Sequence, residues 1–370
     1  MSKSETRTAT LKTLWGDIKR PRTRYRCHNC KSSQSIWTDP SLDSSDCSPL
    51  VLARMQEFAL HVPYRIASDF MHSWGVSISK SEVGSLSRTL EATSTRLATE
   101  KLQGLATHAL ARITKRTVTN ETRAATTWML EVDGSLVPTR VFEETGLARV
   151  EYREVKTAVL YQKNTPSERY QLSVLVGVER FTILLLGLLR FAGVGQADRL
   201  VGLSDGAVWI ANVFDDAMVN YHILDVFHAS SYFETLLVGL GWDETQRKEE
   251  RSRLLRGELD VQLWLNWNVG LSVSQGFNDE TRKALSYLEK QSDLLHTTYP
   301  RFKRLGLEVI GSGEIEGANK SVIGSRLKVS GAQWSESGAN AKSFVRGMWA
   351  SARNVIAFDD ARFEAFPRVA

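Results

Sequence analysis

The chain has 370 residues, of which 42% are hydrophobic and 24% are charged; this is enough apolar material for two or three domains, and it excludes a disordered chain. Lys and Arg number 47 and Asp and Glu 42, which gives a net charge of +5 and a pI near 9.0. That mild basic excess is compatible with a polyanionic partner but does not require one. Three cysteines are too few, and odd in number, for a disulfide scaffold, so we expect a reducing compartment.

Residues 1–48 form a polar, basic segment that is rich in Ser and Thr, with no long periodicity and at most a short hairpin. The first residues lack the apolar core of a signal peptide, and the most apolar run, residues 181–191, is too short to span a bilayer. We therefore expect a cytoplasmic protein without a membrane partner. The stretch KRPRTRYRCHNCK offers candidate phosphate contacts, which are Lys19, Arg20, Arg22, Arg24 and Arg26.

The three cysteines, all in this first segment, are candidate zinc ligands. Cys27 and Cys30 form a Cys-x-x-Cys pair, and Cys47 follows. A closed structural zinc site needs four ligands, and His28, between the paired cysteines, is badly placed to be one. With three secure ligands, the motif is either degenerate or completed from elsewhere.

Residues 49–124 have helical spacing of apolar residues, and they contain the outline of a helix-turn-helix. A helix over 64–74 is followed by a tight GVSIS turn and a second helix over 80–91. Ser79 and Glu82 have the spacing of a capping box at the start of that second helix. Two ordinary packed helices are the alternative. On the DNA-binding interpretation, Lys80 and Arg88 are candidate contacts.

Residues 125–230 predict the first part of an α/β core. We expect strands at 128–132, 150–161, 171–179, 200–203 and 222–227, with helices at 181–195 and 207–220. Residues 231–305 are helical again and indicate an insertion or a separate bundle, whose mixed charges at 246–258 are typical of a solvated helix face. Residues 306–370 complete the core, with helices from residue 314 and over 339–355.

Two aspartates follow predicted strands directly. Asp133 comes after the apolar run WMLEV, and Asp205 has the same position after a later strand; a glycine follows each of them. Each alone is an ordinary turn residue. Since ligands of α/β sheets bind at the carboxyl ends of strands, the two carboxylates can nevertheless converge. Asp225 and His228 flank the end of a further strand, where a His bonded to a backbone carbonyl is the ordinary alternative.

The segment GSGEIEGANKSVIGSRLK, residues 311–328, contains two more acids, Glu314 and Glu316. Positions two apart differ by about 200° around a helix, so only one can face a given site. An ion pair of Glu316 with the residue four positions on is the ordinary alternative. Cations nearby would offset repulsion between phosphate and carboxylates; they are Lys320, Arg326 and Lys328.

Two aspartates and one glutamate form a set of hard oxygen ligands of the kind that Mg²⁺ or Mn²⁺ accepts. Two such ions, roughly 3.5–4 Å apart, activate a water and stabilise the leaving oxygen during phosphodiester cleavage. Asp133, Asp205 and Glu316 are therefore the candidate catalytic metal ligands.

Five segments of the chain resemble, in order, those of DDE transposases of bacterial insertion sequences of the ISKra type. They are VDGSLVP, YREVKTAV, LSDGAVWI, ILDVFHA and GSGEIEGANKSVIGSRLKVSGAQWS, and the resemblance covers roughly residues 20–355. The last is the most specific: the family pattern G-S-G-x-x-E followed by K-x-x-I/V-G-x-R-L-K-x-S-G-x-x-W is matched from Gly311 to Trp334. Its register selects Glu316 over Glu314.

The resemblance implies a ribonuclease H-like core with an α-helical insertion, preceded by a helix-turn-helix-like DNA-binding region. It implies an enzyme that cleaves DNA and transfers strands at the ends of an insertion sequence, with Asp133, Asp205 and Glu316 as catalytic residues. His228 resembles a motif residue that follows the second Asp in several transposase superfamilies. The expected partners are DNA and further copies of the chain assembled on it, at the bacterial nucleoid.

One departure from the family leaves alternatives open. Relatives often have a cysteine-rich, zinc-binding N-terminus, whereas this chain has a single Cys-x-x-Cys. A non-catalytic DNA-binding remnant of a transposase and a ribonuclease H-like nuclease without strand transfer are the competing interpretations. Trp264 and Trp267 also have two interpretations: they stack on an extruded base, or they pack in the core.

Overall fold

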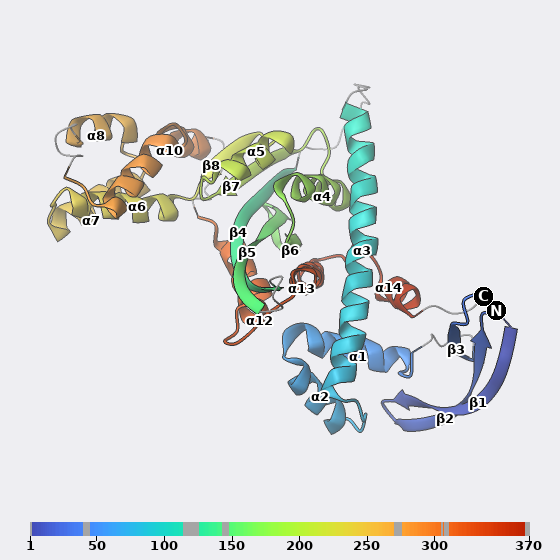
Figure 1. The fold of residues 1–370 in the computed structure, drawn as a ribbon. Coiled ribbons are helices and arrows are strands. Elements are labelled where there is room, and N and C mark those ends of the chain that lie inside the picture. Colours follow the sequence, from blue (N-terminus) through green and yellow to red (C-terminus); the bar gives the residue numbers. More distant parts are fainter. Residues whose placement is uncertain are drawn as a thin grey trace.

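The computed structural model of the protein describes residues 2–39, 45–113, 126–142, 148–269, 276–304, 306 and 311–366. It is a mixed α/β structure with an N-terminal antiparallel sheet, a group of helices, a five-stranded mixed sheet and a lobe of helices (Figure 1). The boundary predicted between residues 124 and 125 lies outside the described residues. None of the described helices is long and apolar enough to cross a membrane.

The N-terminal segment folds into three antiparallel strands, β1 (Ser2–Thr13), β2 (Gly16–Arg26) and β3 (Ser33–Trp37). The expectation of at most a short hairpin was wrong. Most residues of β1 and β2 are exposed on both faces, so the sequence carries no alternation of apolar and polar residues to reveal them. The sheet is fixed to the helices near the β1–β2 turn, where Leu11 is buried.

Three helices follow, α1 (Pro49–His61), α2 (Tyr64–Ser73) and α3 (Lys80–Ile113). The predicted capping box is confirmed, since the backbone N–H of Ser79 donates to Glu82 at 2.9 Å and that of Glu82 donates to the Ser79 hydroxyl at 3.2 Å. The helix predicted over 80–91 instead continues for 34 residues. This long helix connects the N-terminal helices to the part of the chain that forms the five-stranded sheet (Figure 1). It packs on α1 and α2, and its second half packs on α4 (Val178–Ala192).

The five-stranded sheet has the order β6-β5-β4-β7-β8. Its strands are β4 (Thr127–Phe142), β5 (Ala148–Gln162), β6 (Thr165–Val174), β7 (Arg199–Ser204) and β8 (Tyr221–Leu224). The first three in sequence pair antiparallel, whereas β7 and β8 run parallel to β4. One face is covered by α4 and by α5 (Val208–Asp216), over a core that contains Trp128, Leu130 and Val132 of β4.

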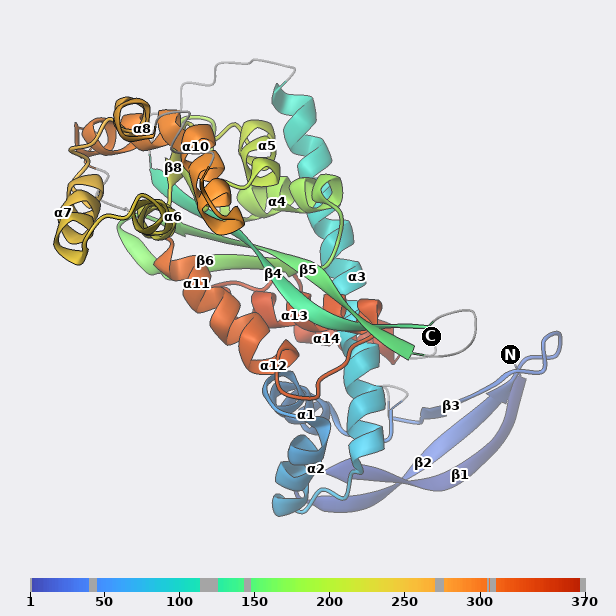
Figure 2. The same cartoon turned by 60° about the vertical axis from the view of Figure 1, so that its left-hand side comes forward.

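The opposite face of the sheet is covered by the last part of the chain (Figure 2). This part consists of α11 (Gly313–Ala318), a π-helical turn η1 (Asn319–Gly324), α12 (Ser325–Leu327) and α13 (Glu336–Trp349). The last helix, α14 (Phe358–Ala365), packs on α3 instead. Ile315 and Ala318 of α11 pack on Met129 of β4. The last long helix was predicted over 339–355, but it begins at Glu336, where Ser335 caps it, and ends at Trp349.

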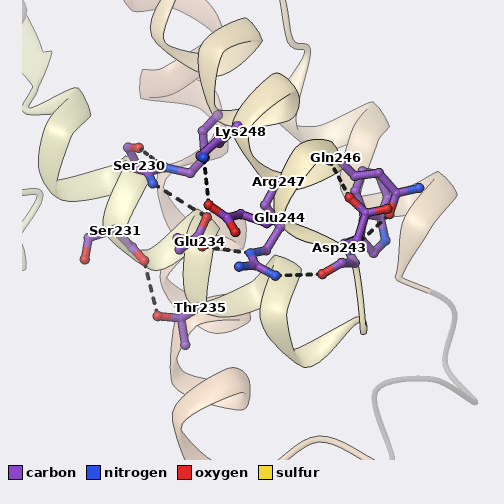
Figure 3. Close-up of polar contacts among 11 residues, drawn as sticks. Ser230, Ser231, Glu234, Thr235, Asp243, Glu244, Gln246, Arg247 and Lys248 are labelled. Carbon is purple, nitrogen blue, oxygen red and sulfur yellow. Dashed lines mark hydrogen bonds and ion pairs between the residues drawn. The ribbon is translucent and has the colours of Figure 1, made fainter.

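The predicted helical insertion is a lobe with its own apolar core. It comprises α6 (Val226–Gly239), α7 (Glu244–Leu255), α8 (Val261–Asn268) and α10 (Asp279–Arg304). Its charged side chains pair between and within helices: Arg247 of α7 donates to Glu234 of α6 at 2.9 Å, and Lys248 pairs with Glu244 of the same helix at 2.7 Å (Figure 3). Of the two tryptophans, Trp264 belongs to this core, whereas Trp267 is 86% exposed.

Candidate functional site

Asp133 lies in the middle of β4, directly opposite Thr157 of β5. The prediction of a strand that ends at Asp133 was wrong. β4 continues to Phe142 because β5 pairs with it along its whole length, and the side chain of Glu154 covers Gly134. The turn propensity of Asp-Gly is thus overridden by strand pairing.

Asp205 follows β7, as predicted, and the register of the parallel strands brings it to Asp133. Glu131 of β4 pairs with Leu203 of β7, and Asp133 and Asp205 each come two residues later, Asp205 just beyond the end of β7. Neighbouring strands lie about 4.8 Å apart. The turn at Gly206, with φ +88°, ends β7, and Asp205 Oδ1 accepts the N–H of Ala207 at 2.9 Å.

The turn that carries Asp205 is held by the helical lobe. Tyr287 of α10 donates its hydroxyl to the carbonyl of Asp205 at 2.6 Å, and Gln291 of the same helix donates to the carbonyl of Gly206 at 2.8 Å. Burial raises the pKa of Tyr287, and the nearby charge of Asp205 raises it further. The phenol therefore stays protonated as a donor, and the lobe fixes one half of the aspartate pair.

Charge at the pair shifts the pKa of Asp133. Partial burial raises this pKa, and the negative charge of Asp205 raises it further, whereas hydrogen bonds from Gly134 and Asn319 and the charge of His228 lower it. Two neighbouring carboxylates of this kind repel each other, and a divalent cation between them removes the repulsion.

The α11–η1 segment places one further side chain on Asp133. Asn319 Nδ2 donates to Asp133 Oδ2 at 2.7 Å. Glu314 forms an ion pair with Arg169 at 2.5 Å, whereas Glu316, one helical turn before Asn319, is exposed. In the part of the chain that the structure describes, no three His, Cys, Asp or Glu side chains lie close enough together to hold one metal ion. The structure therefore pairs Asp133 with Asp205 and leaves Glu316 outside the pair.

Two buried carboxylates fix the start of α11, and the sequence had not marked either as an anchor. Glu131 accepts the hydroxyl of Tyr161 at 2.7 Å and the N–H of Ile315 at 2.8 Å; burial raises its pKa to about 7. Asp225 caps α6 with one oxygen and accepts the N–H and hydroxyl of Ser312 with the other. A glutamate inside the apolar run WMLEV was the available signal for the first anchor.

His228 lies in the first turn of α6, so its predicted position at the end of a strand was wrong. Asp225 accepts the N–H groups of residues 227 and 228 and starts the helix there. The exposed imidazole packs edge-on against Tyr232 and Tyr287, with ring centroids 5.2 and 5.9 Å away. It is close enough to Asp133 for its charge to lower the pKa of that carboxyl.

Most of the predicted DNA contacts are exposed, namely Arg24, Arg26, Lys80, Arg88, Lys320 and Lys328. Arg326 is a correction. It is only 6% exposed, and its guanidinium lies over the rings of Trp334 and Tyr64, at 4.8 and 5.6 Å from their centroids. A cation so enclosed joins α12 to the N-terminal helices and does not face a DNA backbone.

The three cysteines do not converge. Cys47 is buried with α1 and α3 and forms an isolated β-bridge with Lys12, near the end of β1. Cys27 directly follows Arg26 of β2, which pairs with Ser2 at the opposite end of β1. Ten residues of an extended strand separate these positions, which is roughly 33 Å at 3.3 Å per residue. The predicted three-cysteine set is therefore wrong. Cys30 remains near Cys27, and a hydrogen bond with Ser32 lowers the pKa of the Cys30 thiol to about 7.

No model of a known protein family matches this chain, and no curated protein matches its sequence. The resemblance to ISKra-type transposases therefore stays a hypothesis that rests on the motifs themselves.

Proposed function

We propose that this protein is a DDE-type DNA transposase, which cleaves DNA at the ends of an insertion sequence and transfers the freed strands to a target. The observation that carries the proposal is the placement of Asp133 on β4 and of Asp205 directly after β7, the parallel strand that pairs with β4, close enough for the charge of Asp205 to raise the pKa of Asp133. In the ribonuclease H-like fold implied by the motifs, the first Asp lies on the first strand, the second follows the fourth, and the Glu lies on a late helix. Asp133, Asp205 and Glu316 have these positions in the five-stranded sheet and α11.

The residues around the pair suit a divalent cation. The charge of Asp205 acts on Asp133, and Asn319, whose amide N–H bonds Asp133, has a buried Oδ1 with no hydrogen-bond partner. Asp133 and Asp205 would hold Mg²⁺ or Mn²⁺, and Glu316 would join them by a movement of its exposed side chain. When bound, two such ions activate the attacking oxygen and stabilise the leaving oxygen.

The chain's own contribution is to position these groups and to attract DNA. Tyr287 fixes the Asp205 turn, and Glu131 fixes α11. Lys320 and Lys328 are exposed and lie close to Glu316 in sequence, where they would offset the repulsion between the carboxylates and a phosphate backbone. Since strand transfer at both ends of an element needs two active sites, we expect the protein to act as a homo-oligomer on DNA.

One observation favours a second candidate, a DNA-binding transposase remnant without catalysis: Glu316 stands outside the aspartate pair. Divalent-metal-dependent cleavage of DNA that carries the element's ends separates the two. The wild type is compared with Asp133→Asn, Asp205→Asn and Glu316→Gln, and Glu314→Gln serves as the matched control on the same helix. Loss of cleavage in the first three variants, with end binding retained, supports the transposase.

Specific end binding by a wild type that never cleaves would instead support the remnant. Cleavage without joined products, even when target DNA is supplied, would point to a nuclease of the same fold.

A further inference from the structure

We infer that Asn319 supplies its amide oxygen as a ligand to the metal ion that Asp133 and Asp205 hold. The inference rests on the proposed function, and it adds a residue that the motif pattern does not select. Asn319 reaches the pair directly, with Nδ2 at 2.7 Å from Asp133 Oδ2. Among the described residues, no third acidic, His or Cys side chain completes the pair, so this amide is the polar group that the last part of the chain brings to Asp133.

The position of Asn319 is built into the fold. It is the first residue of η1, and π-helical turns recur at functional sites. Arg346 of α13, only 5% exposed, holds this turn by donating to the carbonyls of Val322 at 2.7 Å and Ser321 at 2.6 Å. The widened turn is therefore fixed from outside, and Asn319 remains directed at β4.

Two buried polar atoms close to Asp133 have no hydrogen-bond partner. Asn319 Oδ1 is buried without one, and so is the hydroxyl of Thr157, the residue of β5 directly opposite Asp133. Thr157 itself is completely buried. Burying a polar group without a hydrogen bond costs free energy, so two such atoms beside one carboxylate indicate a group that binds there.

A cation can recruit Asn319 without disturbing the packing. The amide oxygen and nitrogen have nearly the same shape, so a rotation of the amide by half a turn exchanges them. The oxygen then faces the aspartate pair, where a cation takes the place of the N–H bond to Asp133. An amide adds an oxygen ligand without adding negative charge, which keeps the repulsion between the site and a DNA phosphate low.

The test is calorimetric titration of the full chain with Mn²⁺ alone, without DNA. We expect Asn319→Ala to weaken binding by at least about tenfold, the scale typical of a lost metal-site group. Asn319→Asp keeps an oxygen and removes the N–H, so it should bind as tightly as the wild type or more tightly. Ser321→Ala, two residues on with an exposed side chain, is the control and should bind as the wild type does.

Two results would overturn the inference. Wild-type affinity in Asn319→Ala would show that the amide is not a ligand. An affinity of Asn319→Asp as low as that of Asn319→Ala, with both variants melting as the wild type does, would show that Asn319 acts through its N–H and only orients Asp133. A folded wild type that binds no Mn²⁺ would contradict the proposed function itself, whereas binding lost in Asp133→Asn but kept in Asn319→Ala would contradict the ligand role alone.

Discussion

The buried ion pair between α3 and α13 should make stability depend on pH in a predictable way once it is broken. Lys342 is completely buried and donates to Glu91, which is 2% exposed, and to the carbonyl of Ala59 at 3.0 Å. Glu91 also accepts from Gln56 at 3.2 Å and Ser87 at 2.6 Å. Lys342→Met keeps most of the side-chain volume but removes the charge, so a buried carboxylate loses the cation that bonds it directly and keeps only the more distant charges of Arg326 and Arg346.

The cost of this substitution has an upper bound, because Glu91 can take up a proton. With an unfolded pKa of about 4.3, protonation costs about 3.7 kcal/mol at pH 7 but only about 1 kcal/mol at pH 5. We therefore expect Lys342→Met to lower the free energy of unfolding by about 3 kcal/mol at pH 7 and by about 1 kcal/mol at pH 5. The second substitution Glu91→Gln, which stays neutral and keeps an acceptor for both donors, should recover most of the loss at pH 7.

Urea unfolding at both pH values measures these differences for the wild type, Lys342→Met and the double variant. An equal loss at pH 5 and pH 7 would refute the reasoning, because the penalty would not then be the charge of Glu91. A double variant as unstable as Lys342→Met would place the cost in packing instead.

Three further predictions follow from buried groups of the described structure. The folded pKa of Glu131, about 7, lies above its usual value of 4.5. The protein is therefore most stable below pH 4.5, and it loses stability as the pH rises through 7 and the buried carboxyl ionises. In urea unfolding, Glu131→Gln should be more stable than the wild type by about 2–3 kcal/mol at pH 8 and equally stable at pH 4.5. Gly187→Ala would place a Cβ 2.1 Å from a backbone carbonyl oxygen of α3 and should lower the free energy of unfolding by about 3 kcal/mol. Gly104→Ala, with open space around it, should raise the free energy of unfolding by about 0.5–1 kcal/mol in the same urea experiments. Arg326→Ala should lower the melting temperature, whereas Lys328→Ala should leave it unchanged and reduce the salt slope of DNA binding by about one.

The helices near the start of the chain and the position of Asp205 could be predicted because their signals are local. The Ser79–Glu82 capping box and the positive φ of Gly206 depend only on neighbouring residues. The length of β4 could not be predicted, because Asp133-Gly134 is a strong turn signal, and only the pairing with β5 extends the strand through it.

The contact of Asn319 with Asp133 could not be predicted from the sequence for a different reason. Helical periodicity separates Glu314 from Glu316, but it assumes an α-helix, and the chain changes to a π-helical turn at Asn319. This turn is held by Arg346, which lies more than twenty residues later and donates to the carbonyls of Ser321 and Val322. No local pattern marks it, so an asparagine directed at Asp133 could not be anticipated.

The candidate site is held together by groups that lie outside it. Asp133 is fixed by the pairing of two long strands, whereas Asp205 depends on α10 of the helical lobe. The start of α11 depends on Glu131 and Asp225, and the following turn η1 is held by Arg346, which also donates to the carbonyl of Leu60 at the end of α1. Each of the groups that meet at the aspartate pair is thus tied to a different part of the chain. Because these parts share the site, a displacement of the lobe or of the N-terminal helices would change the geometry of the aspartate pair.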